Sequence, residues 1–149
     1  MIIVICGPPG VGKTTVAALL QERLQERGVS FEVLDSDQFS SDPYRQLFER
    51  VSDSDANWIL AGTFYKRKWQ VRFERLEDVV FVYLRAGLET CLERNRNRET
   101  PVEEKAVHII WREFDEPDAD VTLDVADLSP EEVVDLLVET LDLPGSDEP

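Results

Sequence analysis

The chain has 149 residues, of which 42% are hydrophobic, and this is enough for one globular domain with its own core. Its 31 Asp and Glu outnumber its 16 Lys and Arg, so the net charge is −15 and a large basic docking surface for nucleic acid is not expected. Two cysteines do not suggest a disulfide framework, and no hydrophobic run is long enough for a signal peptide or a membrane span, so we expect a cytoplasmic protein.

The acidic residues are spread along the whole chain rather than gathered in one tail. A plain acidic domain is one explanation. We prefer a halophilic protein from a salt-rich cytosol, because concentrated ions screen the self-repulsion of such a surface. The same screening means that the charge does not exclude an RNA partner, although it does not favour one.

Short apolar runs alternate with amphipathic segments along the chain, which predicts strands separated by helices. In chain order we expect a strand at 2–6, a helix at 14–27, a strand at 31–34, a helix at 43–51, a strand at 58–61, a helix at 68–76, a strand at 79–84, helices at 87–97 and 101–114, a strand at 121–125 and a helix at 130–141. This alternation predicts a parallel sheet with right-handed crossovers. We expect a single domain over 1–143, followed by a disordered acidic tail at 144–149.

Residues 7–14, GPPGVGKT, fit the phosphate-binding pattern G-x-x-x-x-G-K-[ST] between the first predicted strand and the first predicted helix. In such a loop the backbone N–H groups surround phosphate oxygens, the lysine reaches the β- and γ-phosphates, and the Thr hydroxyl binds Mg²⁺. We therefore predict that ATP and Mg²⁺ bind here, with the nucleotide held by Gly7, Gly10, Val11, Gly12, Lys13, Thr14 and Thr15.

Ligands of an open parallel sheet lie beyond the carboxyl ends of its strands, and the second predicted strand ends in Asp35-Ser36-Asp37. We assign Asp37 as general base and as a magnesium ligand together with Thr14, and we assign Asp35 mainly to capping the turn. A turn rich in Asp and Ser without a catalytic role is the alternative. The third strand ends in Ala61-Gly62, where a motor ATPase or GTPase would typically place a magnesium-organising aspartate, so those classes are not favoured.

Arginines follow the third and fourth predicted strands. Arg67 is predicted to clamp an anionic acceptor with its forked donors, and a solvated helix start is the alternative. Arg94, Arg96 and Arg98 gather in an otherwise acidic chain, and two arginines four residues apart share a helix face. We predict a mobile lid over about 94–112 in which Arg94 and Arg98 neutralise charge on the transferring phosphoryl group. A solvated basic turn is the alternative.

With these residues in place, the chain resembles small P-loop kinases. Leu34-Asp35-Ser36-Asp37 is similar to the "LDGD"-like strand end of adenylylsulfate kinase. Three other segments resemble the kinase domain of O-phosphoseryl-tRNA(Sec) kinase: residues 63–65 (TFY), 94–96 (RNR) and 113–117 (EFDEP). The resemblance implies a three-layer α/β/α P-loop NTPase fold, a five-stranded parallel sheet of order 2-3-1-4-5, and Mg-ATP as the phosphoryl donor.

The chain also departs from both families. Gly62 stands where the tRNA kinase usually has an aspartate, and we expect no room for that enzyme's additional RNA-binding domain. The acceptor loop and the longer lid of adenylylsulfate kinase do not appear clearly. We expect a kinase that transfers the γ-phosphate to a hydroxyl of a small-molecule acceptor, similar to adenylylsulfate kinase, as a monomer or homodimer. The alternatives are a nucleotide-dependent switch or accessory ATPase, and a tRNA-linked kinase whose recognition domain lies on another chain.

Overall fold

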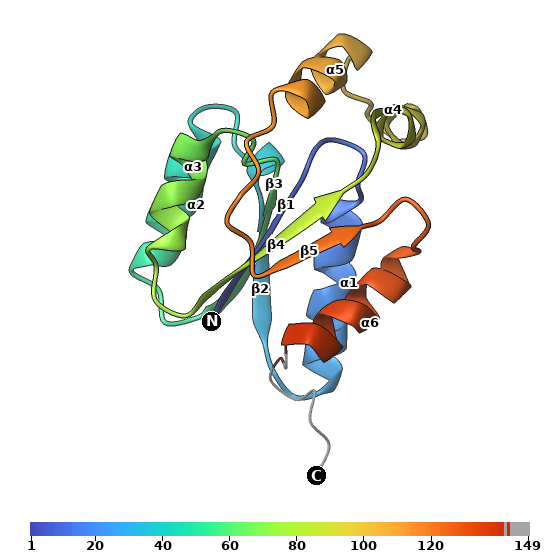
Figure 1. The fold of residues 1–149 in the computed structure, drawn as a ribbon. Coiled ribbons are helices and arrows are strands. Elements are labelled where there is room, and N and C mark those ends of the chain that lie inside the picture. Colours follow the sequence, from blue (N-terminus) through green and yellow to red (C-terminus); the bar gives the residue numbers. More distant parts are fainter. Residues whose placement is uncertain (142, 144–149) are drawn as a thin grey trace.

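The computed structural model describes residues 1–141 and 143, so the tail predicted at 144–149 lies outside the described residues. Five parallel strands form one sheet in the order β2-β3-β1-β4-β5 (Figure 1), which confirms the predicted order. The strands are β1 (Ile2–Cys6), β2 (Phe31–Asp35), β3 (Asn57–Gly62), β4 (Val79–Arg85) and β5 (Val121–Asp124). The first strand lies at the centre of the sheet and is buried along its whole length, as its unbroken apolar sequence requires.

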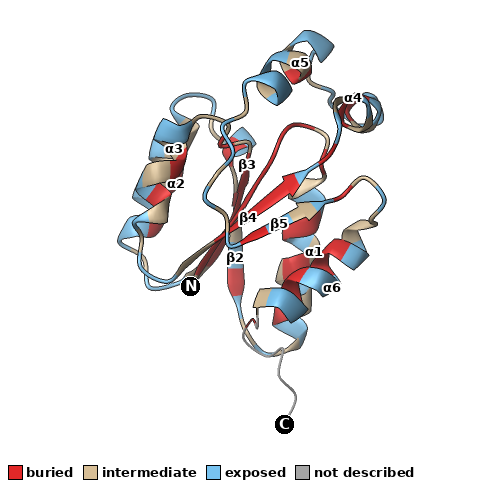
Figure 2. Ribbon diagram, viewed as in Figure 1, coloured by how far each residue is buried: buried red, intermediate tan, exposed pale blue. Residues whose placement is uncertain are grey.

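Helices cover both faces of the sheet, which confirms the three-layer prediction. The helical elements are α1 (Lys13–Glu26), η1 (Ser36–Gln38), α2 (Pro43–Ser52), α3 (Arg67–Glu74), α4 (Leu88–Arg96), α5 (Glu104–Arg112) and α6 (Pro130–Leu141). Side chains alternate across β1, so Ile3 and Ile5 pack with α1 and α6, whereas Ile2 and Val4 pack with α2 and α3. Figure 2 shows the central strands buried between the helices of the two outer layers, whereas α5 lies beyond the strand ends and is mostly exposed.

The prediction for residues 101–114 was wrong at both ends, because α5 covers only Glu104–Arg112. The side chain of Asn95, buried at the end of α4, donates to the Val102 carbonyl at 2.7 Å and accepts from the Val102 N–H at 3.0 Å. These two bonds hold Val102 in the segment between α4 and α5, so α5 begins only at Glu104. Among the described residues, no helix combines the length and the apolar character that crossing a bilayer requires.

Candidate functional site

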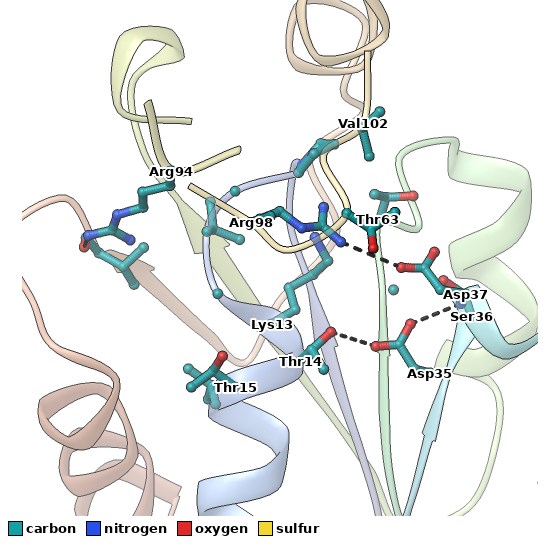
Figure 3. A pocket seen from close by; sticks show the side chains of 18 of the residues that line it. Lys13, Thr14, Thr15, Asp35, Ser36, Asp37, Thr63, Arg94, Arg98 and Val102 are labelled. Atoms are coloured by element: carbon teal, nitrogen blue, oxygen red, sulfur yellow. Dashed lines mark hydrogen bonds and ion pairs between the residues drawn. The ribbon is translucent and has the colours of Figure 1, made fainter. Parts of the chain in front are cut away.

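A cleft of about 1030 Å³ opens where the strands end, and Figure 3 shows the side chains that line it. Its walls come from the loop between β1 and α1, the turn after β2, the segment between α4 and α5, and the start of α6. The cleft is large enough for a nucleotide together with a second small ligand. The lining residues that the sequence analysis selected are Gly10, Val11, Gly12, Lys13, Thr14, Thr15, Asp35, Asp37, Arg94 and Arg98.

The loop between β1 and α1 needs glycine for reasons of space and of backbone conformation. A Cβ atom on Gly7 would lie 2.2 Å from the Leu84 carbonyl oxygen, and one on Gly10 would lie 2.4 Å from the Cys91 carbonyl oxygen. Gly12 precedes α1 with φ +90°, a left-handed conformation that favours glycine. The first N–H groups of α1 have no partner within the helix, and together with the helix dipole they favour an anion at this end.

Lys13 is the first residue of α1, and its Nζ donates to the Pro8 carbonyl oxygen at 3.0 Å across the loop. Burial lowers the pKa of Lys13 from its ordinary 10.5 to about 8, an effect that Asp35 opposes and Arg98 reinforces. A phosphate group in the loop would add negative charge beside this ammonium and would raise its pKa again. The loop therefore holds a cation that is poorly stabilised until an anion binds.

Thr14 and Asp35 form the second polar pair of the cleft. The Thr14 hydroxyl donates to Asp35 Oδ2 at 2.6 Å, and Asp35 Oδ1 accepts from the Asp37 N–H at 2.9 Å (Figure 3). Asp35 is the cap of η1, as expected, but it also engages the threonine of the phosphate loop. The sequence analysis missed this second contact, because it depends on how α1 lies over the neighbouring strands.

The two carboxylates after β2 have different surroundings. Both oxygens of Asp35 accept hydrogen bonds, whereas the Asp37 side chain is 78% exposed and has Arg98 Nη2 at 4.0 Å from its Oδ2. Thr14 and these carboxylates fit Mg²⁺, which is usually held by one or two protein oxygen groups together with phosphates and waters. Among the described residues there is no group of three or more His, Cys, Asp or Glu that could hold a metal without such help.

Gly62 is the last residue of β3 and stands where a motor ATPase or GTPase would typically have a magnesium-organising aspartate. The side chains of Ser36 and Phe64 lie beside it. A Cβ on Gly62 would lie 2.9 Å from Ser36 Oγ and 3.1 Å from the Phe64 ring. The side chains of Ser36 and Phe64 therefore occupy the space that a side chain at position 62 would need, while Gly62 itself lines the cleft.

One end of the cleft is aromatic and carries two hydroxyl groups. Tyr44 Oη lies 2.8 Å from Thr63 Oγ1 and accepts from the Phe64 N–H at 3.0 Å, and burial raises the pKa of Tyr44. Phe64 has φ +46°, a strained conformation for a bulky residue, and its neighbours hold it there. Tyr44 was not selected from the sequence, because it belongs to an ordinary amphipathic helix and to no motif.

Two segments that carry the family resemblance meet beside this aromatic end. Asp115 donates its N–H to the Tyr65 carbonyl and accepts from the Arg67 N–H, each at 2.9 Å. Gln70, which is fully buried, donates to the carbonyl oxygens of Phe64 at 2.8 Å and Asp115 at 2.6 Å. These bonds fix the loop between β3 and α3 against the segment that follows α5.

The three arginines near the end of α4 point in different directions. Arg94 donates to the carbonyl oxygens of Val125 at 2.8 Å and Ala126 at 3.1 Å, on the side of the cleft formed by β5 and α6. Arg98 points into the cleft beside Lys13 and Asp37 (Figure 3). Arg96 pairs with Glu104 and does not line the cleft. Arg94 and Arg98, which are four residues apart, therefore both reach the site.

The structure does not bring Arg67 into the cleft. Its guanidinium donates to Gln70 Oε1 at 3.0 Å and to the two Glu74 carboxylate oxygens at 2.5 and 2.8 Å. Arg67 is absent from the cleft lining, whereas Tyr44 and Thr63 belong to it. Its predicted role as an acceptor clamp stays a prediction that requires these contacts to open.

A parallel sheet of order 2-3-1-4-5 with a G-x-x-x-x-G-K-[ST] loop between β1 and α1 defines a P-loop protein with a kinase-like fold. Residues 3–120 match the AAA_18 family, described as an AAA domain, and the chain belongs to this family.

Similar proteins include kinases. L-seryl-tRNA(Sec) kinase of Methanococcus maripaludis is 23% identical over 148 residues, which cover 87% of this chain and 58% of that kinase. The chain therefore spans little more than half the length of this relative. A gluconokinase structure from Sinorhizobium meliloti 1021 has a TM-score of 0.77 at 16% identity, covering 94% of this chain and 90% of the other. A sugar kinase structure from Janibacter sp. HTCC2649 also has a TM-score of 0.77, at 22% identity, covering 99% and 98%. These structures establish a shared fold.

Proposed function

We propose that the chain is an ATP-dependent kinase that transfers the γ-phosphate of Mg-ATP to a hydroxyl group of a small-molecule acceptor. The observation that supports this most directly is the meeting of Lys13, Thr14, Asp37 and Arg98 in one cleft. These side chains would supply a phosphate-binding cation, a magnesium-binding hydroxyl, an exposed carboxylate and a second cation. A phosphotransferase uses this set, since its catalysis consists mostly of positioning and charge neutralisation.

The phosphate loop and Lys13 would hold the triphosphate of ATP. Thr14, Asp35 and Asp37 are the residues that would hold Mg²⁺, which neutralises charge on the β- and γ-phosphates when bound. Arg94, which donates to the carbonyl oxygens of Val125 and Ala126, lies on the opposite side of the cleft from Thr63 (Figure 3), and this side would border the nucleoside.

Asp37 is the proposed general base. Its carboxylate takes the proton of the acceptor hydroxyl as the hydroxyl oxygen forms a bond to the γ-phosphorus and the bond from that phosphorus to the bridging oxygen of ADP breaks. Arg98 would compensate the negative charge of the moving phosphoryl group. The exposed position of Asp37 at the aromatic end supports this role, because an acceptor bound beside Tyr44 and Thr63 would lie within its reach.

The direct test is a phosphorylation screen of a metabolite pool with γ-labelled ATP and Mg²⁺, in concentrated KCl to suit the acidic surface. A labelled product is expected with the wild-type protein and none with Lys13→Ala. ADP release that no acceptor stimulates, with no labelled product, would instead indicate the nucleotide-dependent switch.

The curated relative supports a second candidate, which is transfer to the seryl hydroxyl of a seryl-tRNA. The mechanism would be the same, because the acceptor is again a hydroxyl group. The screen should therefore include seryl-tRNA(Sec) beside the small molecules. Labelling of the tRNA and of no metabolite would favour this candidate over the first.

A further inference from the structure

Helices α2 and α3 lie on the same face of the sheet, contact each other, and gather many of the cations of this acidic chain (Figure 1). Residues 43–75 contain seven of the 16 Lys and Arg but only four of the 31 Asp and Glu. The composition alone did not lead us to expect a basic surface. The bases are concentrated, however, and this stretch is locally positive in a protein of net charge −15.

Three of these cations lie over aromatic rings and not beside carboxylates. The distance from the cation to the ring centre is 5.7 Å for Arg50 over Phe39, 5.4 Å for Lys68 over Trp69, and 4.2 Å for Arg72 over Phe48. Within the described ranges, 1–141 and 143, these three cations form no ion pair. All three residues are exposed, so their charge remains available to a partner.

Two of the three rings under these cations, Trp69 and Phe48, pack against other aromatic rings. Tyr44 of α2 stacks on Trp69 of α3 with ring centres 4.9 Å apart, and Phe48 meets Phe73 edge to face at 5.5 Å. Arg72 of α3 lies over Phe48 of α2, so the cation itself bridges the two helices. The rings beneath Lys68 and Arg72 are therefore fixed before any partner binds, which reduces the entropy lost on binding.

This surface, defined by Arg50, Lys68, Arg72 and the rings beneath them, continues into the cleft. Tyr44 and Phe39 belong to both, since they line the cleft and contact Trp69 and Arg50 respectively. A partner that covers the surface would end beside Thr63 and Asp37, at the proposed acceptor side.

We propose that the α2–α3 surface binds single-stranded RNA. Unpaired cations along two adjacent helices match the repeated charge of a phosphate backbone, and partly exposed aromatic rings between them suit unstacked bases. A docked strand would bring a hydroxyl carried at its end to the cleft. The inference goes beyond the proposed function, because binding at this surface requires neither ATP nor phosphoryl transfer.

The experiment is fluorescence anisotropy of the full chain, without nucleotide, with a labelled single-stranded RNA of about 15 nucleotides. It is done over KCl concentrations at which circular dichroism shows the fold intact. The triple variant Arg50→Gln/Lys68→Gln/Arg72→Gln should lose at least about tenfold in affinity. The negative slope of log K against log salt should become shallower by about 2, because each of the three lost phosphate contacts contributes about 0.7 for a single strand.

Two further variants and a competitor decide the outcome. Arg85→Gln/Lys105→Gln/Arg112→Gln changes the net charge equally with exposed residues outside α2 and α3, and it should stay within about threefold of wild type. Arg50→Lys/Arg72→Lys retains the charge and should also retain affinity. The proposal would be overturned if the wild type bound no RNA, or if both triple variants lost affinity equally. It would also be overturned if polyglutamate competed as well as unlabelled RNA, or if DNA of the same sequence bound more tightly than the RNA. ATP affinity is measured in parallel. If the proposed kinase function fails, RNA binding should remain intact, so the two failures can be distinguished.

Discussion

Thr14 at the start of α1 and Asp35 at the end of β2 are joined by a hydrogen bond of 2.6 Å, although β3 separates β2 from β1 in the sheet. The hydroxyl hydrogen points to the carboxylate, so the lone pairs of the Thr14 oxygen remain directed elsewhere and available to a cation. Asp35 thus orients, from two strands away, the Thr14 hydroxyl that we propose as a magnesium ligand.

Asp35→Asn should therefore weaken magnesium binding more than nucleotide binding. The asparagine can still accept from the Asp37 N–H, which preserves the turn, but it loses the charge that faces Thr14. Because residues that orient a metal ligand typically contribute 10- to 100-fold in affinity, we expect the Mg²⁺ concentration for half-maximal activity to rise by about that factor. Titration of activity with MgCl₂ at saturating ATP measures it, and an unchanged midpoint would contradict the role.

Asp37→Asn should spare ATP binding and cripple transfer. The side chain is mostly exposed and its nearest cation lies at 4.0 Å, so the substitution should leave the fold intact. General bases contribute about 10² to 10⁴ in rate, and kcat should fall by that factor while the Kd for ATP, measured by calorimetry, changes less than about threefold. Transfer at the wild-type rate would eliminate Asp37 as the base.

Lys13 should impose an alkaline limit on nucleotide capture. Its pKa in the free protein is about 8, and the ammonium form, which binds phosphate, disappears as the pH rises through that value. We expect kcat/KM for ATP to decline tenfold per pH unit above about pH 8, while kcat stays constant to higher pH because bound phosphates raise the pKa. A pH profile that is flat to about 10 would contradict this.

Lys13→Met should also abolish turnover without lowering the Tm of the ligand-free protein at pH 7. Burial disfavours the ammonium in the folded chain, so at pH 7 the charge of Lys13 lowers the free energy of unfolding. This cost declines only as the pH rises above about 8, where Lys13 loses its proton in the folded state. A Tm several degrees below that of the wild type would show that the ammonium stabilises the empty loop.

Arg98 and Arg96 form a matched pair for testing the lid. Arg98 points into the cleft, whereas Arg96 pairs with Glu104 outside it. Arg98→Gln should lower kcat by about 10³ or more, as expected for a cation that compensates charge on the transferring phosphoryl group. Arg96→Gln removes the same charge two residues away and should change kcat less than about threefold. Equal effects in the two variants would exclude a specific role for Arg98.

The parts of the molecule that the sequence predicted well are those fixed by short-range patterns. The continuous apolar run of β1 and the glycine positions around Lys13 specify a buried strand and a phosphate loop whatever the rest of the chain does. Arg94 and Arg98 both line the cleft, but Arg98 lies beyond the end of α4 and the two side chains point in different directions, so their helical spacing did not predict their arrangement. The Thr14–Asp35 bond, the Tyr44–Thr63 contact and the ion pair that holds Arg67 could not be predicted, because each joins side chains whose relative direction is set by helix packing.

Gln70 should be a major determinant of stability and of the shape of the acceptor side. It is fully buried, and its amide group donates to the carbonyl oxygens of Phe64 and Asp115. Gln70→Leu would leave both carbonyls unpaired, which should lower the free energy of unfolding by about 2–4 kcal/mol. Urea denaturation measures this, with Gln25→Leu on the exposed side of α1 as a control expected within about 0.5 kcal/mol of wild type. Because Gln70 also holds the loop between β3 and α3, the KM for the acceptor should rise more than the KM for ATP, and a loss of stability with both values unchanged would restrict Gln70 to a structural role.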